Sequence, residues 1–214
     1  MAKNGSVSMS VIKRMPRYYR FLGDLKSQGI SRISSRELSL RMGLTASQIR
    51  QDFSCFGGFG QQGYGYNVSE LQKEIAKIIG LGNIQKTLII GAGNLGKTIA
   101  MYVKRELHTF EIIGIFDRKE SMVGQMVAEI PIRSIETLEE FCKENLPTVA
   151  VLCVPFDAAS EACLKLAECG IKAVLNFTHY DVALNFPQMK VENIHMNDSF
   201  MTLCYKINSE EKDK

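Results

Sequence analysis

The residues best suited to chemistry are three glycines, which stand at the spacing G-x-G-x-x-G in the segment GAGNLG. An apolar run, TLII, precedes them and an amphipathic stretch, KTIAMYV, follows. The first glycine permits a tight turn, the second lets a pyrophosphate approach the backbone, and the third lets helix and strand pack closely. Free N–H groups at the start of the helix then attract phosphate. The pattern predicts a dinucleotide site whose pyrophosphate lies against six residues: Gly91, Ala92, Gly93, Asn94, Leu95 and Gly96.

A carboxylate follows at the distance that such a site requires. The run EIIGIF reads as a second strand and ends in Asp117, which lies 21 residues after Gly96. A carboxylate there can accept both hydroxyl groups of the adenosine ribose and repels the extra phosphate of NADP. The expected cofactor is therefore NAD, as NAD+ or NADH. Arg118, directly after the carboxylate, keeps NADP open as an alternative.

Further alternation of strands and helices indicates an open parallel sheet. We expect a helix over 135–145, a strand over 148–154, a helix over 157–168 and a strand over 172–177. Ligands of such folds lie at the carboxyl ends of the strands. We therefore place three strand-end residues near the nicotinamide: Val154, Pro155 and Asn176.

The first eighty residues must do something else, because they are basic and helical. They hold twelve Lys and Arg against five Asp and Glu, whereas the rest of the chain holds fourteen against eighteen. Such a split favours a polyanion partner for the first part. Helices are predicted over 11–28, with Ile12, Tyr19, Leu22 and Leu25 on one side, then from Ser34 to Gly43, and from Thr45 onward. Ser34 to Glu37 form a capping box, and Thr45 caps the third helix.

The second and third helices fit a helix-turn-helix whose second helix enters the major groove of DNA. The polar side of that helix can bond purine edges or phosphates. An ordinary amphipathic surface helix is the alternative. After it, GGFGQQGYGYNV mixes glycines with aromatic residues and predicts a β-hairpin wing along the DNA backbone; a fourth helix, capped at Ser69, closes the domain. The DNA-binding residues expected are Lys13, Arg14, Ser47, Gln48, Arg50, Gln51, Ser54, Gln61 and Tyr64.

Other sites are not indicated. The six cysteines form no C-x-x-C pair and the three histidines are scattered, so we expect no metal site. A thiol switch stays an alternative. No run is long and apolar enough for a membrane span, and the N-terminus has no secretory signal, so we expect a cytoplasmic protein without a membrane partner.

An enzyme is not expected, because one Rossmann domain uses almost all the residues after position 80 and leaves no substrate domain. No Tyr-x-x-x-Lys pair or positioned proton donor is visible, and we predict no catalytic residue. A last helix over 195–208 has an apolar stripe with Met196, Phe200, Leu203 and Ile207. We expect it to pack on a second subunit, with packing on its own domain as the alternative.

Taken together, these segments resemble the Rex family of redox-sensing transcriptional repressors. The resemblance rests on IKRMPRYYRFL, RISSRELSLRMGL, QIRQDFSCFGGFGQQGYGYNV, LIIGAGNLGKTIAMY and KVEN. It implies a homodimer with a swapped C-terminal helix, which high NADH relative to NAD releases from pseudo-palindromic operators. Departures from the family pattern are Gln51, Gln61 and Gln62 at usually basic positions, His195 at a position that is usually Asp, and a longer segment FTHYDVALNFP.

The expected fold class is α/β. An N-terminal winged helix-turn-helix domain over 1–80 precedes a Rossmann-like, doubly wound parallel sheet over 86–194 and the C-terminal helix. Two other functions stay open. One is a small NAD(P)-dependent oxidoreductase with an N-terminal assembly domain, and the other is a domain for a different nucleotide, such as coenzyme A.

Overall fold

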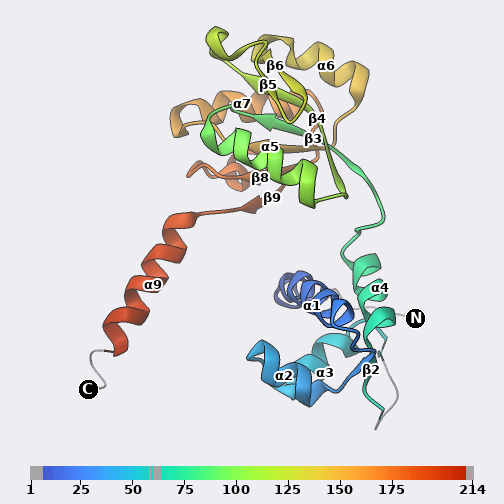
Figure 1. Cartoon of the computed structure of the whole chain (residues 1–214). Coiled ribbons are helices and arrows are strands. Elements are labelled where there is room, and N and C mark those ends of the chain that lie inside the picture. Colours follow the sequence, from blue (N-terminus) through green and yellow to red (C-terminus); the bar gives the residue numbers. More distant parts are fainter. Residues whose placement is uncertain (1–6, 58, 60–63, 211–214) are drawn as a thin grey trace. The chain divides into compact units, whose positions relative to one another are not determined.

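The computed structural model describes residues 7–57, 59 and 64–210. The chain divides into two compact units, Met1–Asn83 and Ile84–Lys214 (Figure 1). Separate groups of buried apolar residues form the core of each unit. The predicted α/β fold class, a helical N-terminal unit followed by a Rossmann-like sheet and a last helix, is confirmed.

The N-terminal unit is built from helices, joined by one short antiparallel ribbon. Its elements are α1 (Met9–Ser27), β1 (Arg32–Ile33), α2 (Ser35–Met42), α3 (Ala46–Ser54), β2 (Tyr66–Asn67) and α4 (Val68–Ile78). The predicted caps of α2 and α3 are confirmed. Ser34 and Glu37 form the capping box, and the Thr45 side chain accepts from the N–H of Gln48. Gly43 ends α2 in the left-handed region at φ 65°.

Two local predictions in this unit were wrong. The cap of α4 is Asn67, whose Oδ1 accepts from the N–H of Glu70, and not Ser69. The buried side of α1 is Val11, Met15, Tyr18, Leu22 and Leu25. The sequence pattern had placed Ile12 and Tyr19 there, but packing against α3 and α4 selects residues one position away.

The ribbon includes the last part of the segment predicted to form the wing. β2 pairs with β1, which precedes α2, with Ile33 opposite Tyr66. Gly65 is required at this crossing, because its φ is +70° and a Cβ there would lie 2.7 Å from the carbonyl oxygen of Ile33. Residues 58 and 60–63 of the glycine-rich segment lie outside the described residues, and the predicted β-hairpin falls largely on them.

The C-terminal unit is a seven-stranded sheet with the order β5-β6-β4-β3-β7-β8-β9. All neighbouring strands are parallel except β5 and β6. Leaving out β5, this order is the Rossmann order, which reverses between β3 and β7. The strands are β3 (Gln85–Ile90), β4 (Phe110–Asp117), β5 (Met126–Val127), β6 (Ile130–Ser134), β7 (Val149–Leu152), β8 (Ala173–Asn176) and β9 (Lys190–Asn193). The sequence reading missed β5, β6 and β9.

Helices cover both faces of the sheet. Leu88 and Ile90 of β3 pack with α6 and α7 in one core, whereas Ile89 packs with α5 in the other. A strand buried on both faces reads as a continuous apolar run, which is why TLII gave no alternation. The helical segments of this unit are α5 (Asn94–Glu106), η1 (Glu120–Met122), η2 (Ile135–Thr137), α6 (Leu138–Asn145), α7 (Phe156–Glu168), α8 (Val182–Asn185) and α9 (Met196–Glu210).

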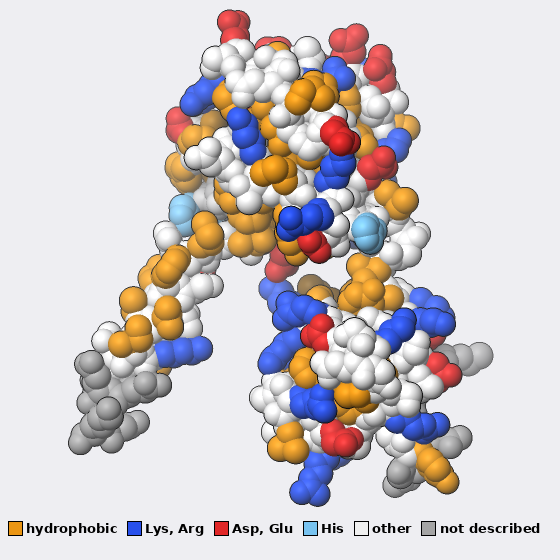
Figure 2. All heavy atoms as spheres, in the orientation of Figure 1, with side chains coloured by type: hydrophobic (Ala, Val, Ile, Leu, Met, Phe, Trp, Pro, Cys, Tyr) orange, Lys and Arg blue, Asp and Glu red, His pale blue; other side chains and the backbone are white. Residues whose placement is uncertain are grey.

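The last helix, α9, follows β9 and leaves the sheet (Figure 1). Its apolar side chains are exposed in the single chain, with Phe200 65% and Leu203 52% accessible. Figure 2 shows these hydrophobic side chains gathered along the helix. None of the helices in the described part of the chain has the length and apolar character needed to cross a bilayer.

Candidate dinucleotide-binding site and nucleic-acid interface

The glycine segment lies where β3 ends and α5 begins, at the point where the strand order reverses. Gly91 has φ +96°, and a Cβ there would lie 2.5 Å from the carbonyl oxygen of Cys153 on the neighbouring chain segment. A Cβ on Gly96 would lie 2.0 Å from the carbonyl oxygen of Gly91. At Gly93 nothing stands within 4 Å, so this position leaves the N-terminus of α5 open to a ligand.

Asp117 ends β4 beside this loop and is half-buried. Its Oδ2 accepts from the N–H of Ala92 at 2.7 Å, and its Oδ1 accepts from the N–H of Lys119 at 2.9 Å. The two backbone donors fix the plane of the carboxylate. Each oxygen keeps further lone pairs for hydroxyl donors, as ribose recognition requires.

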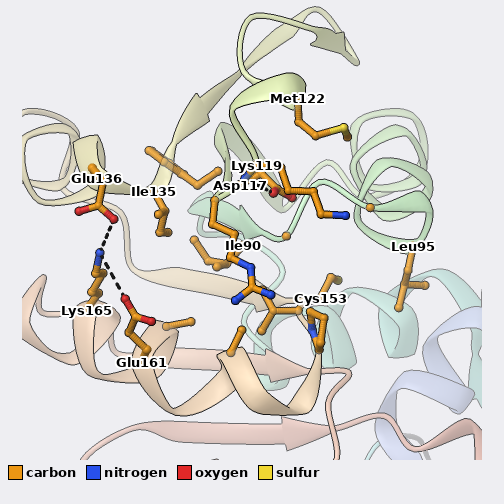
Figure 3. A pocket seen from close by; sticks show the side chains of 18 of the residues that line it. Ile90, Leu95, Asp117, Lys119, Met122, Ile135, Glu136, Cys153, Glu161 and Lys165 are labelled. Carbon is orange, nitrogen blue, oxygen red and sulfur yellow. Dashed lines mark hydrogen bonds and ion pairs between the residues drawn. The ribbon is translucent and has the colours of Figure 1, made fainter.

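A cavity of about 490 Å³ opens at this place, a volume in the range of small-molecule sites. Figure 3 shows Asp117 and Lys119 near its middle, Leu95 and Cys153 toward one end, and Ile135, Glu136 and Lys165 toward the other. Eight of the predicted cofactor residues line it: Gly91, Gly93, Asn94, Leu95, Asp117, Arg118, Val154 and Pro155.

Three predicted cofactor residues do not line the cavity. Ala92 is fully buried, and Gly96 packs against the loop of Gly91. The buried Asn176 amide donates to the carbonyl of Tyr180 at 3.0 Å and to the Asn193 side chain at 2.8 Å, while its oxygen accepts from Thr178. These bonds turn Asn176 toward its own segment, so it holds the ends of β8 and β9 together.

Several lining residues were missed by the sequence reading: Ile90, Phe116, Lys119, Met122, Ile135, Glu136, Cys153, Ala158, Glu161, Ala162 and Lys165. Ile135 and Glu136 follow β6, a strand that was not predicted. Lys165 of α7 contacts Glu136 at 2.9 Å and Glu161 at 3.7 Å, which joins two elements at the rim (Figure 3). In the sequence, the i, i+4 spacing of Glu161 and Lys165 indicated an ion pair on this helix.

Cys153 is the thiol nearest to the glycine loop. Burial raises the pKa of Cys153 to about 12, so the thiol stays protonated at neutral pH. A protonated thiol is a poor nucleophile. The residue therefore contributes shape to the cavity and little reactivity.

In the N-terminal unit, α3 presents a polar face. Ser47, Arg50, Gln51 and Ser54 are exposed, and Gln48 is half-buried at the edge of this face. Arg50 donates from Nη1 to the Ser35 hydroxyl at 3.2 Å, which links α3 to the start of α2. Four of the five predicted groove residues are thus exposed and Gln48 is partly accessible, as base or phosphate contact requires.

Behind this face lies a buried carboxylate that the sequence reading did not assign. Asp52 is 0% exposed and accepts four hydrogen bonds. Arg14 donates to both carboxylate oxygens at 2.7 Å, Tyr18 donates to Oδ2 at 2.8 Å, and the Gln48 amide donates to Oδ1 at 2.8 Å. The network fastens α3 to α1.

The charge of Asp52 is maintained by these donors. Burial acts to raise its pKa, but the hydrogen bonds from Arg14, Tyr18 and Gln48 outweigh it, so the net pKa is lowered. Burial, together with the bond to the carboxylate, raises the pKa of Tyr18, which stays a donor.

The remaining predicted DNA contacts have different surroundings. Arg14 was expected at phosphates, but its Nε and one Nη donor are engaged by Asp52. Lys13 is exposed on α1, and Tyr64 is 70% exposed. Gln61 lies outside the described residues. Among those residues that are described, no group of three His, Cys, Asp or Glu side chains could hold a metal ion.

Fold and site together define a class of protein with a Rossmann-type cavity in one unit and a helix-turn-helix in the other, and comparisons with known proteins agree. Residues 6–54 match the family model "Putative DNA-binding protein N-terminus", and residues 82–180 match "CoA binding domain". The chain is 47% identical to the redox-sensing transcriptional repressor Rex of Thermoanaerobacter pseudethanolicus, over 99% of this chain and 94% of that one. It is 45% identical to the Rex of Clostridium kluyveri, over 99% and 100%.

Solved structures give the same result. A crystal structure of RSP, a Rex-family repressor, matches with a TM-score of 0.88 and 45% identity, over 97% of this chain and 98% of that one. RSP in complex with β-NAD+ and operator DNA matches with a TM-score of 0.89 and 46% identity, over 97% and 95%. RSP in complex with β-NADH matches with a TM-score of 0.88 and 43% identity, over 97% of each chain. The chain belongs to the Rex family of redox-sensing transcriptional repressors.

Proposed function

We propose that this chain represses transcription by binding operator DNA as a homodimer, and that NADH, when high relative to NAD+, releases it. One observation carries the proposal. The match to the repressor solved with β-NAD+ and operator DNA extends over both units at 46% identity. A shared fold alone would say little about function. Here the cavity suits a dinucleotide, and the exposed polar face of α3 suits DNA.

The dinucleotide would lie across the carboxyl ends of β3, β4 and β7. Its pyrophosphate would rest on the start of α5 at Gly93, Asn94 and Leu95, where N–H groups and the helix dipole favour anions. The adenosine ribose would bond Asp117. Val154 and Pro155 would lie toward the nicotinamide end. A carboxylate at the ribose disfavours NADP, although Arg118 and Lys119 adjoin it.

On the DNA side, the exposed face of α3 supports groove contact. Arg50 and Gln51 present long side chains with several donors, and Ser47 lies in the first turn, where recognition helices meet base edges. Lys13 adds positive charge from α1. Salt should weaken operator binding steeply, because phosphate contacts release counterions.

A dimer supplies the partner that α9 lacks in the single chain. Its exposed Phe200, Leu203 and Ile207 are costly to leave in water, since burying a large apolar side chain stabilises by about 1.5–3 kcal/mol. A two-fold operator also needs two recognition helices. A cytoplasmic location follows from the proposal, because the operator lies on the chromosome.

No catalytic role is proposed. The named relatives are repressors, and Cys153, the thiol at the glycine loop, is held protonated. The oxidoreductase alternative is not favoured.

The test is a gel shift with an inverted-repeat operator, in which NAD+ and NADH are titrated separately. We expect a complex that NADH dissociates and NAD+ maintains, and Arg50→Ala should weaken it. Equal binding with either form of the cofactor would reject the sensor function. Substrate-dependent oxidation of NADH, followed at 340 nm, would favour an enzyme.

A further inference from the structure

The buried Asp52 has a consequence for how α3 reads DNA, and this inference rests on the proposed function. The carboxylate receives donors on both oxygens: Arg14 and Tyr18 on Oδ2, and Arg14 and Gln48 on Oδ1. A carboxylate offers about four acceptor positions. Asp52 is therefore saturated, and each of its partners is held in one orientation.

Gln48 is the partner that also reaches the reading face. It belongs to the first turn of α3, beside Ser47, and it is half-buried at the edge of the exposed side. Residues at the start of a recognition helix contact base edges. Gln48 is thus the one member of the network that lies on the recognition helix beside the exposed face.

The chemistry of the amide decides which way Gln48 faces. Its Nε2 donates to Asp52 Oδ1 at 2.8 Å. The opposite orientation would set the amide oxygen against a carboxylate oxygen, two acceptors without a proton between them. Because nitrogen and oxygen diverge from the same amide carbon, fixing Nε2 inward turns Oε1 away from Asp52. A free glutamine can exchange the two groups by turning its amide, but this one cannot: one of the two hydrogens on Nε2 is committed to Asp52, and Oε1 is the group turned away from the carboxylate.

We infer that Asp52 is a positioning residue which fixes Gln48 as a hydrogen-bond acceptor in the major groove, so that Gln48 selects the exocyclic amino group of a base. Only two bases carry such a donor in the major groove, adenine at N6 and cytosine at N4. Guanine and thymine present acceptors at the corresponding positions. Gln48 would therefore discriminate against guanine and thymine on the strand it contacts.

Gln51 is the matched comparison, since it is the same residue type one turn along on the same helix. It is exposed, and its side-chain amide has no hydrogen-bond partner among the described residues. Nothing in its surroundings fixes its amide, so it can present donor or acceptor as the base requires. Gln48 thus has a fixed role as an acceptor, whereas Gln51 can act as a donor or an acceptor.

The experiment uses the full-length chain and base analogues in one operator. Gln48→Ala first identifies the base pair at which preference is lost. There, the amino-bearing base is replaced by an analogue that lacks only its exocyclic amino group, purine for adenine or pyrimidin-2-one for cytosine. We expect the wild-type chain to lose about 3- to 10-fold in affinity, the size of one hydrogen bond. Gln48→Ala should show the same loss on the natural operator and no further loss on the analogue.

Two control variants separate the effect of the fixed Gln48 amide from a general effect on the fold of α3. Gln51→Ala should keep the full sensitivity to the analogue, and Gln48→Met, which keeps the aliphatic length, should behave as Gln48→Ala. The inference is overturned if removing an acceptor, as in a 7-deaza purine, reproduces the loss while removing the amino group does not. It is also overturned if Gln48→Ala alters no base preference although the wild-type chain binds its operator. A wild-type chain that selects no operator would overturn the proposed function as well.

Discussion

Asp52 and Asp117 are carboxylates placed in opposite surroundings, one in each unit. Asp52 is fully buried and receives its donors from three side chains on two helices. Asp117 is half-buried at a strand end and receives two backbone donors while it faces a cavity. The first joins α1 to α3 behind the exposed face of α3, and the second lines the cavity proposed to bind the dinucleotide. Under the proposed function, an acidic residue thus serves architecture in one unit and ligand recognition in the other.

The largest expected effect is a loss of stability when the buried carboxylate of Asp52 is removed. Asp52→Ala leaves the Arg14 guanidinium without its partner, and removing one member of a buried ion pair costs about 3–5 kcal/mol. We expect the N-terminal unit to unfold at a much lower urea concentration. The control is Glu139→Ala, which removes an exposed pair with Lys143 and should leave the midpoint unchanged. Equal midpoints for Asp52→Ala and the wild type would show that the network is not structural.

A substitution at Asp117 should lower the affinity for NADH and leave the fold intact. Asp117→Ala removes the proposed acceptor for the ribose hydroxyls, and hydrogen bonds to charged groups contribute about 1.5–3 kcal/mol, or about 10- to 100-fold in affinity. Calorimetric titration with NADH measures this loss of affinity. Glu111→Ala, at the exposed amino end of the same strand, should bind NADH as the wild type does. Unchanged NADH affinity in Asp117→Ala would remove this residue from the site.

Two glycines sharpen the same contrast within the C-terminal unit. Gly96→Ala should destabilise it by about 1–3 kcal/mol, because the new Cβ would lie 2.0 Å from the carbonyl oxygen of Gly91. Gly93→Ala meets nothing within 4 Å and should fold normally, but its methyl group would stand where the pyrophosphate approaches. Thermal unfolding and NADH titration of both variants separate these effects; a stable Gly96→Ala chain contradicts the packing role.

The smallest effect is a pH dependence, since it comes only from the difference between folded and unfolded pKa values. The folded pKa of Asp52 is lowered from 3.8, so its contribution to stability is complete above that value. It is lost as the pH falls from about 4 through the folded pKa, because the unfolded carboxyl then binds its proton first. Urea midpoints between pH 6 and pH 3 should fall for the wild type, and fall less for Asp52→Ala.

Local features were predictable from the sequence. The Ser34 and Thr45 caps, the glycine loop and the strand before Asp117 are patterns within a few residues, and the hydrogen bonds of the two caps close over three positions. Asn67 was missed as a cap because Ser69 offers a similar side chain two residues later. β9 was missed because KVEN alternates weakly and lies at a sheet edge, where burial leaves little signal.

The sequence by itself predicted the glycine loop of a dinucleotide site and the capped helices of a helix-turn-helix, because both patterns depend on short-range spacing. Only the tertiary structure decided the partners of residues far apart in the chain. Arg14 and Asp52 are 38 positions apart, and Ile135 and Glu136 reach the cavity only because β6 pairs with β4. The physical reason is that periodicity within one segment shows which face is buried, whereas the partner of a side chain is set by how two elements pack together.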